Sequence, residues 1–203
     1  MFRQRRERLK GLSFNKMIPN ILTMLALCAG LTAIRFGLEE KWEAALISLA
    51  IAAILDSLDG RIARALRGTS KFGAELDSLS DFICFGVAPA ILLYLWTMKD
   101  AGRYGWVLVL LFSVCCALRL ARFNTDIEGP ELPNWTKNYF TGVPAPAGAG
   151  LVLLPMIISF QTDMSFLREP FFVAIFIFVV SGLLVSQLPT YSFKTLRIQH
   201  RFI

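Results

Sequence analysis

Histidine and cysteine, the residues that most often bind zinc or form nucleophile–base pairs, are scarce in this sequence. His200 is the only histidine among 203 residues, and it lies in a basic tail where a solvated side chain is more typical than a catalytic base. The four cysteines form no Cys-x-x-Cys pair and fall within apolar stretches, at positions 28, 84, 115 and 116. This pattern argues against a zinc site and against a disulfide framework. It favours cysteines that act as small apolar packing residues.

Charged residues are also few, at 18% of the chain, whereas roughly a quarter of an average soluble domain is charged. Hydrophobic residues make up 55%, the mean hydropathy is +0.56, and the apolar residues gather in long uncharged runs such as 82–98 and 170–193. A transmembrane helix needs about 20 mostly apolar residues. We therefore predict an all-α integral membrane protein with six transmembrane helices, over 17–37, 43–66, 72–97, 104–122, 143–161 and 170–190.

The placement of lysine and arginine predicts how the chain is oriented. Sixteen of the 21 basic residues lie before the first span or at and beyond the ends of the second, fourth and sixth spans. Because basic residues stay on the cytoplasmic side, we expect both termini and the 123–142 loop to face the cytoplasm from the inner (cytoplasmic) membrane. The net charge of +6 then indicates contact with anionic lipid headgroups. It does not indicate nucleic-acid binding, because the basic residues are divided among span ends and form no single face.

We expect a single membrane domain over 1–203. Its parts are a basic cytoplasmic segment, 1–16, a six-helix catalytic core, 17–190, and a basic cytoplasmic tail, 191–203. The first segment is compatible with a short amphipathic helix that lies on the membrane surface.

Four aspartates lie within or beside the second and third predicted spans, where each buried charge costs at least about 2.5 kcal/mol. Asp56 and Asp59 are three residues apart, and Asp77 and Asp81 are four apart, so each pair lies on one helix face. The turn at 68–71 makes the two helices antiparallel neighbours, and their carboxylates then converge. Converging carboxylates call for a cation, and all-oxygen ligands suit Mg²⁺ or Mn²⁺, with Ca²⁺ as an alternative. A cation transporter, in which the aspartates form an ion path, is the alternative from another functional class.

Small residues lie beside these aspartates. Gly60 follows Asp59 directly, Ala63 lies four residues after Asp59, and Gly73 lies four residues before Asp77. Together they could line a slot for a flat group next to the metal. Close packing between membrane helices also selects small residues and is the alternative interpretation.

The stretch as a whole resembles the CDP-alcohol phosphotransferase family. The family signature is Asp-x2-Asp-Gly-x2-Ala-Arg-x8-Gly-x3-Asp-x3-Asp, and every fixed position is present: Asp56, Asp59, Gly60, Ala63, Arg64, Gly73, Asp77 and Asp81. The resemblance implies a six-helix membrane fold, usually dimeric. It also implies that Asp56, Asp59 and Asp77 hold metal on a diphosphate, and that Asp81 is the general base and touches a second metal. Gly60, Ala63, Arg64 and Gly73 would then bind the nucleotide.

Three further blocks, 81–90, 117–124 and 140–147, resemble the bacterial membrane-type phosphatidylserine synthases. That resemblance implies transfer of a phosphatidyl group from CDP-diacylglycerol to the hydroxyl of L-serine, with release of CMP. Sibling enzymes that use glycerol 3-phosphate, inositol phosphate or choline share the signature and remain open.

A candidate pocket for the acceptor follows from the end of the fourth span. Arg119 and Arg122 are three residues apart, so they share a helix face, and an arginine fork suits a carboxylate. Asn124 and Thr141 follow nearby and could orient the ammonium or the hydroxyl. The alternative is that both arginines only anchor a helix end at anionic headgroups.

Overall fold

The computed structural model describes residues 14–66, 68, 70–128, 139–162, 164–186 and 189–191. The predicted amphipathic segment lies outside these residues except for 14–16, and so does nearly all of the basic tail. Half of the predicted cytoplasmic loop also lies outside them, at 129–138.

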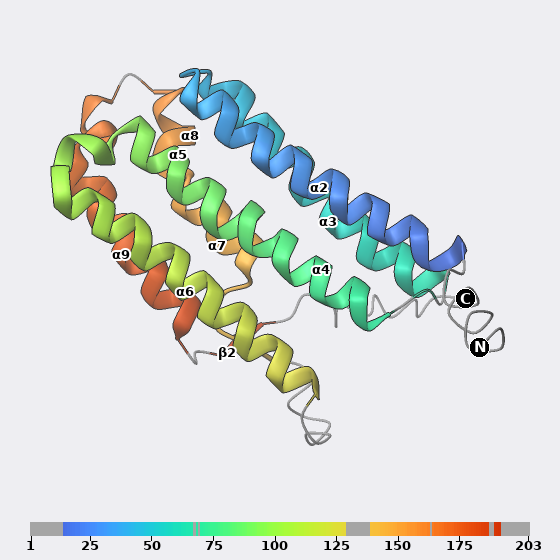
Figure 1. Ribbon diagram of the computed structural model, residues 1–203. Helices are drawn as coiled ribbons and strands as arrows, with labels where there is room; N and C mark the ends of the chain where they lie inside the picture. Colours follow the sequence, from blue (N-terminus) through green and yellow to red (C-terminus); the bar gives the residue numbers. More distant parts are fainter. Residues whose placement is uncertain are drawn as a thin grey trace, which may run out of the picture.

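Two long helices, α2 (Phe14–Leu38) and α3 (Trp42–Ala65), form an antiparallel hairpin (Figure 1). In the turn between them, Glu40 has a φ of 58°, and the Glu39 carboxylate accepts hydrogen bonds from Arg35 and Lys41. Alanines occupy buried positions on both helices, and this allows the two backbones to approach closely: Ala26, Ala33, Ala45 and Ala52.

The next helical run changes its winding directly after the last signature aspartate. It consists of α4 (Lys71–Asp81), a π-helical segment η1 (Phe82–Val87) and α5 (Ala88–Trp96). Ser70 caps α4 by accepting a 3.0 Å hydrogen bond from the Gly73 amide. A Cβ atom at Gly30 of α2 would lie 2.6 Å from Cys84 Sγ, so glycine is what lets α2 lie against η1. Short π-helical segments are frequent at functional sites.

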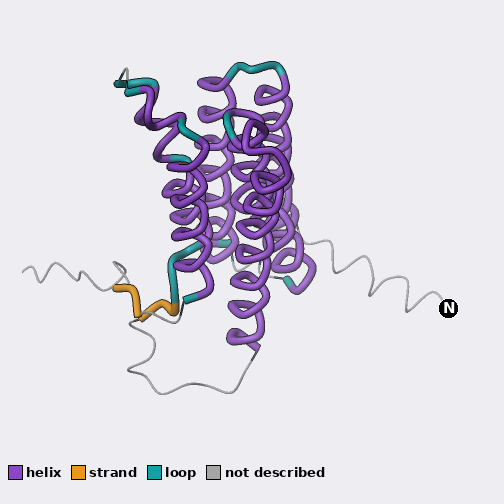
Figure 2. Tube along the Cα trace, turned by 90° about the vertical axis from the view of Figure 1, so that its left-hand side faces the viewer, coloured by secondary structure: helices purple, strands orange, loops and turns teal. Residues whose placement is uncertain are grey.

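The second half of the chain covers the other side of this run. It comprises η2 (Met98–Ala101), α6 (Gly102–Glu128), α7 (Ala145–Val152), α8 (Leu154–Ser159), η4 (Ser165–Arg168) and α9 (Pro170–Val185). Helix α6 packs along α9, and α7 also contacts α9. The strands β1 (Tyr139–Thr141) and β2 (Pro189–Tyr191) form a short antiparallel ladder at one end of the bundle (Figure 2).

A glycine joins this ladder to the bundle. Gly142 has a φ of +77°, and a Cβ atom there would lie 2.7 Å from the Ser186 carbonyl oxygen and 3.1 Å from that of Leu184. Only glycine fits both the backbone conformation and the close approach. The chain is thereby held against the C-terminal end of α9.

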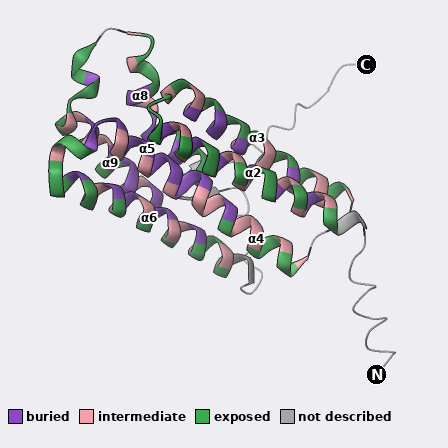
Figure 3. Cartoon of the chain, turned by 45° about the horizontal axis from the view of Figure 1, so that its top comes forward, coloured by how far each residue is buried: buried purple, intermediate pink, exposed green. Residues whose placement is uncertain are grey.

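The buried side chains lie between the helices, whereas large apolar side chains also cover the outer surface (Figure 3). Leu31, Ile47 and Phe178 are among these exposed apolar residues. An apolar exterior of this kind suits contact with lipid rather than water. Helix α5 is the most enclosed element, with six of its nine residues buried.

The prediction of an all-α membrane protein is confirmed, with the short β1–β2 ladder as the one addition among the described residues. Within the described part of the chain, three segments are long and apolar enough to cross a bilayer, Met17–Leu38, Lys71–Trp96 and Met98–Thr125. Two further apolar helical segments, Ala145–Ser159 and Pro170–Val185, are shorter. The count of six spans therefore stays a prediction. The fifth expected helix is divided at Leu153, because Pro155 in the first turn of α8 has no amide hydrogen to continue α7.

Candidate active site

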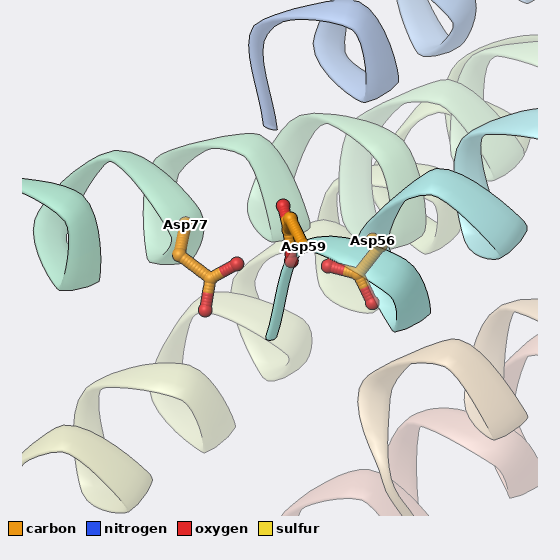
Figure 4. Close-up of side chains that lie close together, drawn as sticks. All are labelled: Asp56, Asp59 and Asp77. Carbon is orange, nitrogen blue, oxygen red and sulfur yellow. The ribbon is translucent and has the colours of Figure 1, made fainter. Parts of the chain in front are cut away.

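The carboxylates of Asp56, Asp59 and Asp77 converge from α3 and α4 (Figure 4). One oxygen from each lies within 4.8 Å of the others. Asp59 is only 3% exposed, and the other two are half-buried. Three carboxylates at this separation repel one another, and hard divalent cations bind oxygen ligands of this type. The three residues therefore form an all-oxygen group whose chemistry suits a hard divalent cation such as Mg²⁺ or Mn²⁺.

Asp81 lies beside this group, one helical turn after Asp77. It is close enough to interact electrostatically with the other three carboxylates. Its Oδ1 atom is buried and has no hydrogen-bond partner among the described residues. A buried oxygen of this kind can accept a proton or a hydrogen bond from a bound molecule.

A cavity of about 380 Å³ opens next to the carboxylates. Asp59 and Asp77 form part of its wall, and all four predicted nucleotide-binding residues line it: Gly60, Ala63, Arg64 and Gly73. The remaining wall comes from α2, from the turn before α4, from α4 itself and from α6: Pro19, Asn20, Thr23, Gly68, Ser70, Ala74 and Phe123. The volume is that of a small-molecule site.

The two signature glycines of the cavity differ in their surroundings. A Cβ atom at Gly60 would meet only the tip of Arg64, at 4.0 Å, so helix packing does not require glycine there. A Cβ atom at Gly73 would lie 2.9 Å from Asn20 Oδ1 and 3.1 Å from Ser70 Oγ. The slot interpretation therefore suits Gly60, whereas close packing of α4 on α2 accounts for Gly73.

Two of the predicted acceptor residues bind backbone carbonyl groups within the bundle. The Arg119 Nε–H group donates to the Val143 carbonyl oxygen, and Arg122 Nη1 donates to that of Val185 at 3.1 Å. Arg119 is also close enough to Asp81 to interact with it electrostatically. Both arginines therefore extend toward other segments of the chain, which is not the behaviour of a simple headgroup anchor.

Of the other two predicted acceptor residues, Asn124 has a described side chain and Thr141 does not. The Asn124 side-chain amide donates to Ser78 Oγ at 2.9 Å, next to Asp77. This bond ties α6 to α4 beside the carboxylates. Thr141 belongs to β1, but its side chain lies outside the described part.

Comparison with known proteins agrees with this geometry. The chain matches the CDP-alcohol phosphatidyltransferase family over residues 16–185. It belongs to the CDP-alcohol phosphatidyltransferase family. It is 44% identical over 183 residues to the CDP-diacylglycerol–serine O-phosphatidyltransferase of Mycobacterium leprae, covering 90% of this chain and 61% of that protein. The enzymes of the same name from Helicobacter pylori (strain 26695) and Bacillus subtilis are 36% and 35% identical. The matches cover 89% and 87% of this chain, and 74% and 91% of those relatives.

The family signature lies on α3 and α4, yet α2 also reaches the site, and sequence reasoning missed this contribution. Thr23 Oγ1 donates a 2.5 Å hydrogen bond to Asp59 Oδ2, and Asn20 lies close against Gly73 on the cavity wall. The available signal was a pair of polar residues three apart on a mostly apolar helix, Asn20, directly after Pro19, and Thr23.

Replacing Asp59 by Ala should remove the central oxygen ligand of the candidate metal site. We expect Mn²⁺ affinity, measured by electron paramagnetic resonance on detergent-purified protein, to fall more than about 100-fold, since loss of an outer-shell partner alone costs about 10–100-fold. Asp100→Ala, at an exposed position in η2, is the matched control and should bind Mn²⁺ like the wild type. Equal Mn²⁺ affinity in the Asp59→Ala protein would show that the cluster is not the metal site.

Proposed function

We propose that this protein is a phosphatidylserine synthase, which transfers the phosphatidyl group of CDP-diacylglycerol to L-serine and releases CMP. The observation that carries the proposal is the convergence of Asp56 with Asp59 and Asp77, the latter two on the wall of a cavity that Gly60, Ala63, Arg64 and Gly73 also line. The choice of serine rests on relatives named CDP-diacylglycerol–serine O-phosphatidyltransferase, which are 35–44% identical.

In this proposal, Asp56, Asp59 and Asp77 hold Mg²⁺ or Mn²⁺, with Ca²⁺ as an alternative. A divalent ion there, when bound, neutralises the diphosphate and eases departure of the nucleotide. Gly60 leaves the cavity open beside Asp59, so the nucleotide can lie against the α3 backbone. Arg64, on the same wall, supplies a positive charge for phosphate oxygens.

Asp81 acts as the general base. The serine hydroxyl oxygen forms a bond to the phosphorus that carries diacylglycerol, and the bond from that phosphorus to the bridging oxygen breaks, so CMP leaves. The hydroxyl proton passes to Asp81. Its buried Oδ1 atom, which has no partner among the described residues, supports this role because it is free to accept that proton.

Arg119 and Arg122 bind the serine carboxylate, with Asn124 and Thr141 orienting the ammonium or the hydroxyl. A guanidinium group has five N–H donors, and the described structure gives each arginine one bond to a carbonyl oxygen. The remaining donors can form a fork for a carboxylate. In this proposal, a serine held by the two arginines presents its hydroxyl to Asp81.

The depth of the site in the membrane suits one lipid substrate and one water-soluble substrate. Asp59 lies six residues before the end of α3, about 9 Å along the helix axis. A site at that depth can receive a lipid diphosphate from the bilayer and serine from the aqueous side. We place this side in the cytoplasm, with the protein in the inner membrane as a homodimer.

An acceptor panel tests the proposal. We expect purified protein with CDP-diacylglycerol micelles and Mn²⁺ or Mg²⁺ to release CMP when L-serine is added. Glycerol 3-phosphate, inositol phosphate and choline should not support release, and omission of the lipid or the metal should abolish it. Release with one of those alcohols and not with serine would assign the protein to a sibling activity. Cation uptake by liposomes without CDP-lipid would instead support a transporter.

Replacing Asp81 by Asn should separate proton transfer from metal binding. We expect kcat to fall about 10²–10⁴-fold, which is the usual contribution of a general base. Mn²⁺ binding and CDP-lipid affinity should stay close to those of the wild type, unlike in Asp59→Ala. A rate within threefold of wild type would exclude Asp81 as the base, and a loss of Mn²⁺ binding would make it a ligand.

Replacing Arg119 or Arg122 by Lys should test the carboxylate fork. Lysine keeps the charge and can still donate to a carbonyl oxygen, but it has no planar fork. We expect the serine KM to rise tenfold or more, about 1.4 kcal/mol, with the KM for CDP-lipid little changed. Arg103→Lys, at an exposed position near the other end of α6, is the control. Wild-type serine kinetics in both variants would place the serine pocket elsewhere.

A further inference from the structure

Helix α2 carries none of the signature aspartates, yet it packs against both helices that do. Its contacts include α3 along its length and α4, and α3 and α4 contact each other less extensively in the described structure. Thr23 lies on this shared face and is 4% exposed. The position of the Asp59 carboxylate relative to that of Asp77 therefore depends on α2.

Thr23 contacts both aspartate-bearing helices. Its Oγ1 hydroxyl donates to Asp59 Oδ2 at 2.5 Å, and its carbonyl oxygen accepts a 3.3 Å hydrogen bond from Ser80, directly before Asp81. The hydroxyl has one proton and a second acceptor within reach, the Pro19 carbonyl oxygen at 3.1 Å. Since a bond to a carboxylate is shorter and stronger than one to a neutral carbonyl, the Thr23 hydroxyl donates its hydrogen bond to Asp59 rather than to Pro19.

This hydrogen bond differs from what threonine usually does in a helix. Thr32, on the same helix, donates at 2.7 Å to the Cys28 carbonyl oxygen four residues before it, which is the ordinary local bond. Thr32 is exposed and has no carboxylate partner among the described residues. Thr32 is therefore a suitable control position for substitutions at Thr23.

The hydrogen bond from Thr23 restricts a side-chain rotation of Asp59 that packing alone does not fix. The terminal torsion of an aspartate has broad energy wells, so rotamer preference does not fix where its two oxygens point. Figure 4 shows the Asp59 carboxylate between those of Asp56 and Asp77. A rotation of Asp59 would therefore disturb the middle of the three-oxygen group.

We propose that Thr23 is a positioning residue for the metal site. By engaging Oδ2 of Asp59, its hydroxyl fixes the carboxylate plane, so that the group presents an oxygen toward Asp56 and Asp77. Partners of this kind orient metal ligands and set their affinity. The inference rests on the proposed metal site and adds a fourth residue, from a third helix, to what that site requires.

The test compares Thr23→Val, which removes the hydroxyl at nearly constant shape, with Thr23→Ser, which keeps it. Mn²⁺ affinity is measured by electron paramagnetic resonance without substrate, and the half-activating Mn²⁺ concentration is measured from CMP release. We expect Thr23→Val to lower the Mn²⁺ affinity and to raise the half-activating Mn²⁺ concentration, each about 10–100-fold. Both quantities should stay within about threefold of wild type in Thr23→Ser. Thr32→Val should match the wild type in both.

Each other outcome opposes the inference. Wild-type Mn²⁺ affinity in Thr23→Val would show that Thr23 only packs, and an equal loss in Thr23→Ser would show that the hydroxyl is not the cause. Thr23→Ala gives the same comparison should Thr23→Val not fold, as judged by its thermal unfolding in detergent. A wild-type protein that binds no Mn²⁺ would overturn the metal site and this inference together. Loss of binding in Asp59→Ala with none in Thr23→Val would overturn this inference alone.

Discussion

Electrostatic repulsion among Asp56, Asp59 and Asp77 is the constraint around which the described helices are arranged. Each charge placed within a membrane helix costs at least about 2.5 kcal/mol, and a folded protein is stable by only about 5–15 kcal/mol. The structure moderates this cost in three ways. Asp59 and Asp77 lie six residues from the end of α3 and from the start of α4, Asp56 and Asp77 remain half-exposed, and the most buried one, Asp59, accepts a hydrogen bond. The charge that remains concentrated there favours binding of a cation.

The rest of the bundle holds these charged helices at a fixed separation. Buried alanines let α2 lie close along α3, and Gly30 lets the same helix reach η1, where the run that carries Asp77 and Asp81 continues. From the other side, Asn124 ties α6 to α4 next to Asp77. Arg119 and Arg122 then connect α6 to the carbonyl groups at the start of α7 and the end of α9. Movement of any of these helices would therefore change the spacing of the carboxylates.

Sequence reasoning predicted the parts of this arrangement that depend on local pattern. Uncharged runs predicted the helices, and the three- and four-residue spacings placed each aspartate pair on one face. What it missed depends on contacts between distant segments. Thr23 reads as an ordinary helical threonine until α3 is packed against it, and nothing local predicts a π-helical segment after Asp81. The bonds from the two arginines to Val143 and Val185 were hidden for the same reason, since their partners lie 24 and 63 residues away.

The arrangement also explains how one site can serve a lipid and a water-soluble substrate. On α4, Asp77 faces the cavity, whereas Phe72 and Leu79 are 69% and 63% exposed on the outside of the same short helix. A lipid can therefore lie against the apolar outer face while its diphosphate reaches the carboxylates, a distance of about one helix diameter. Arg119, on α6, donates to the Val143 carbonyl oxygen and would offer a charged acceptor a fixed positive group. In the proposed reaction, the serine hydroxyl would attack the phosphorus from the side opposite the departing CMP oxygen, as an in-line displacement requires.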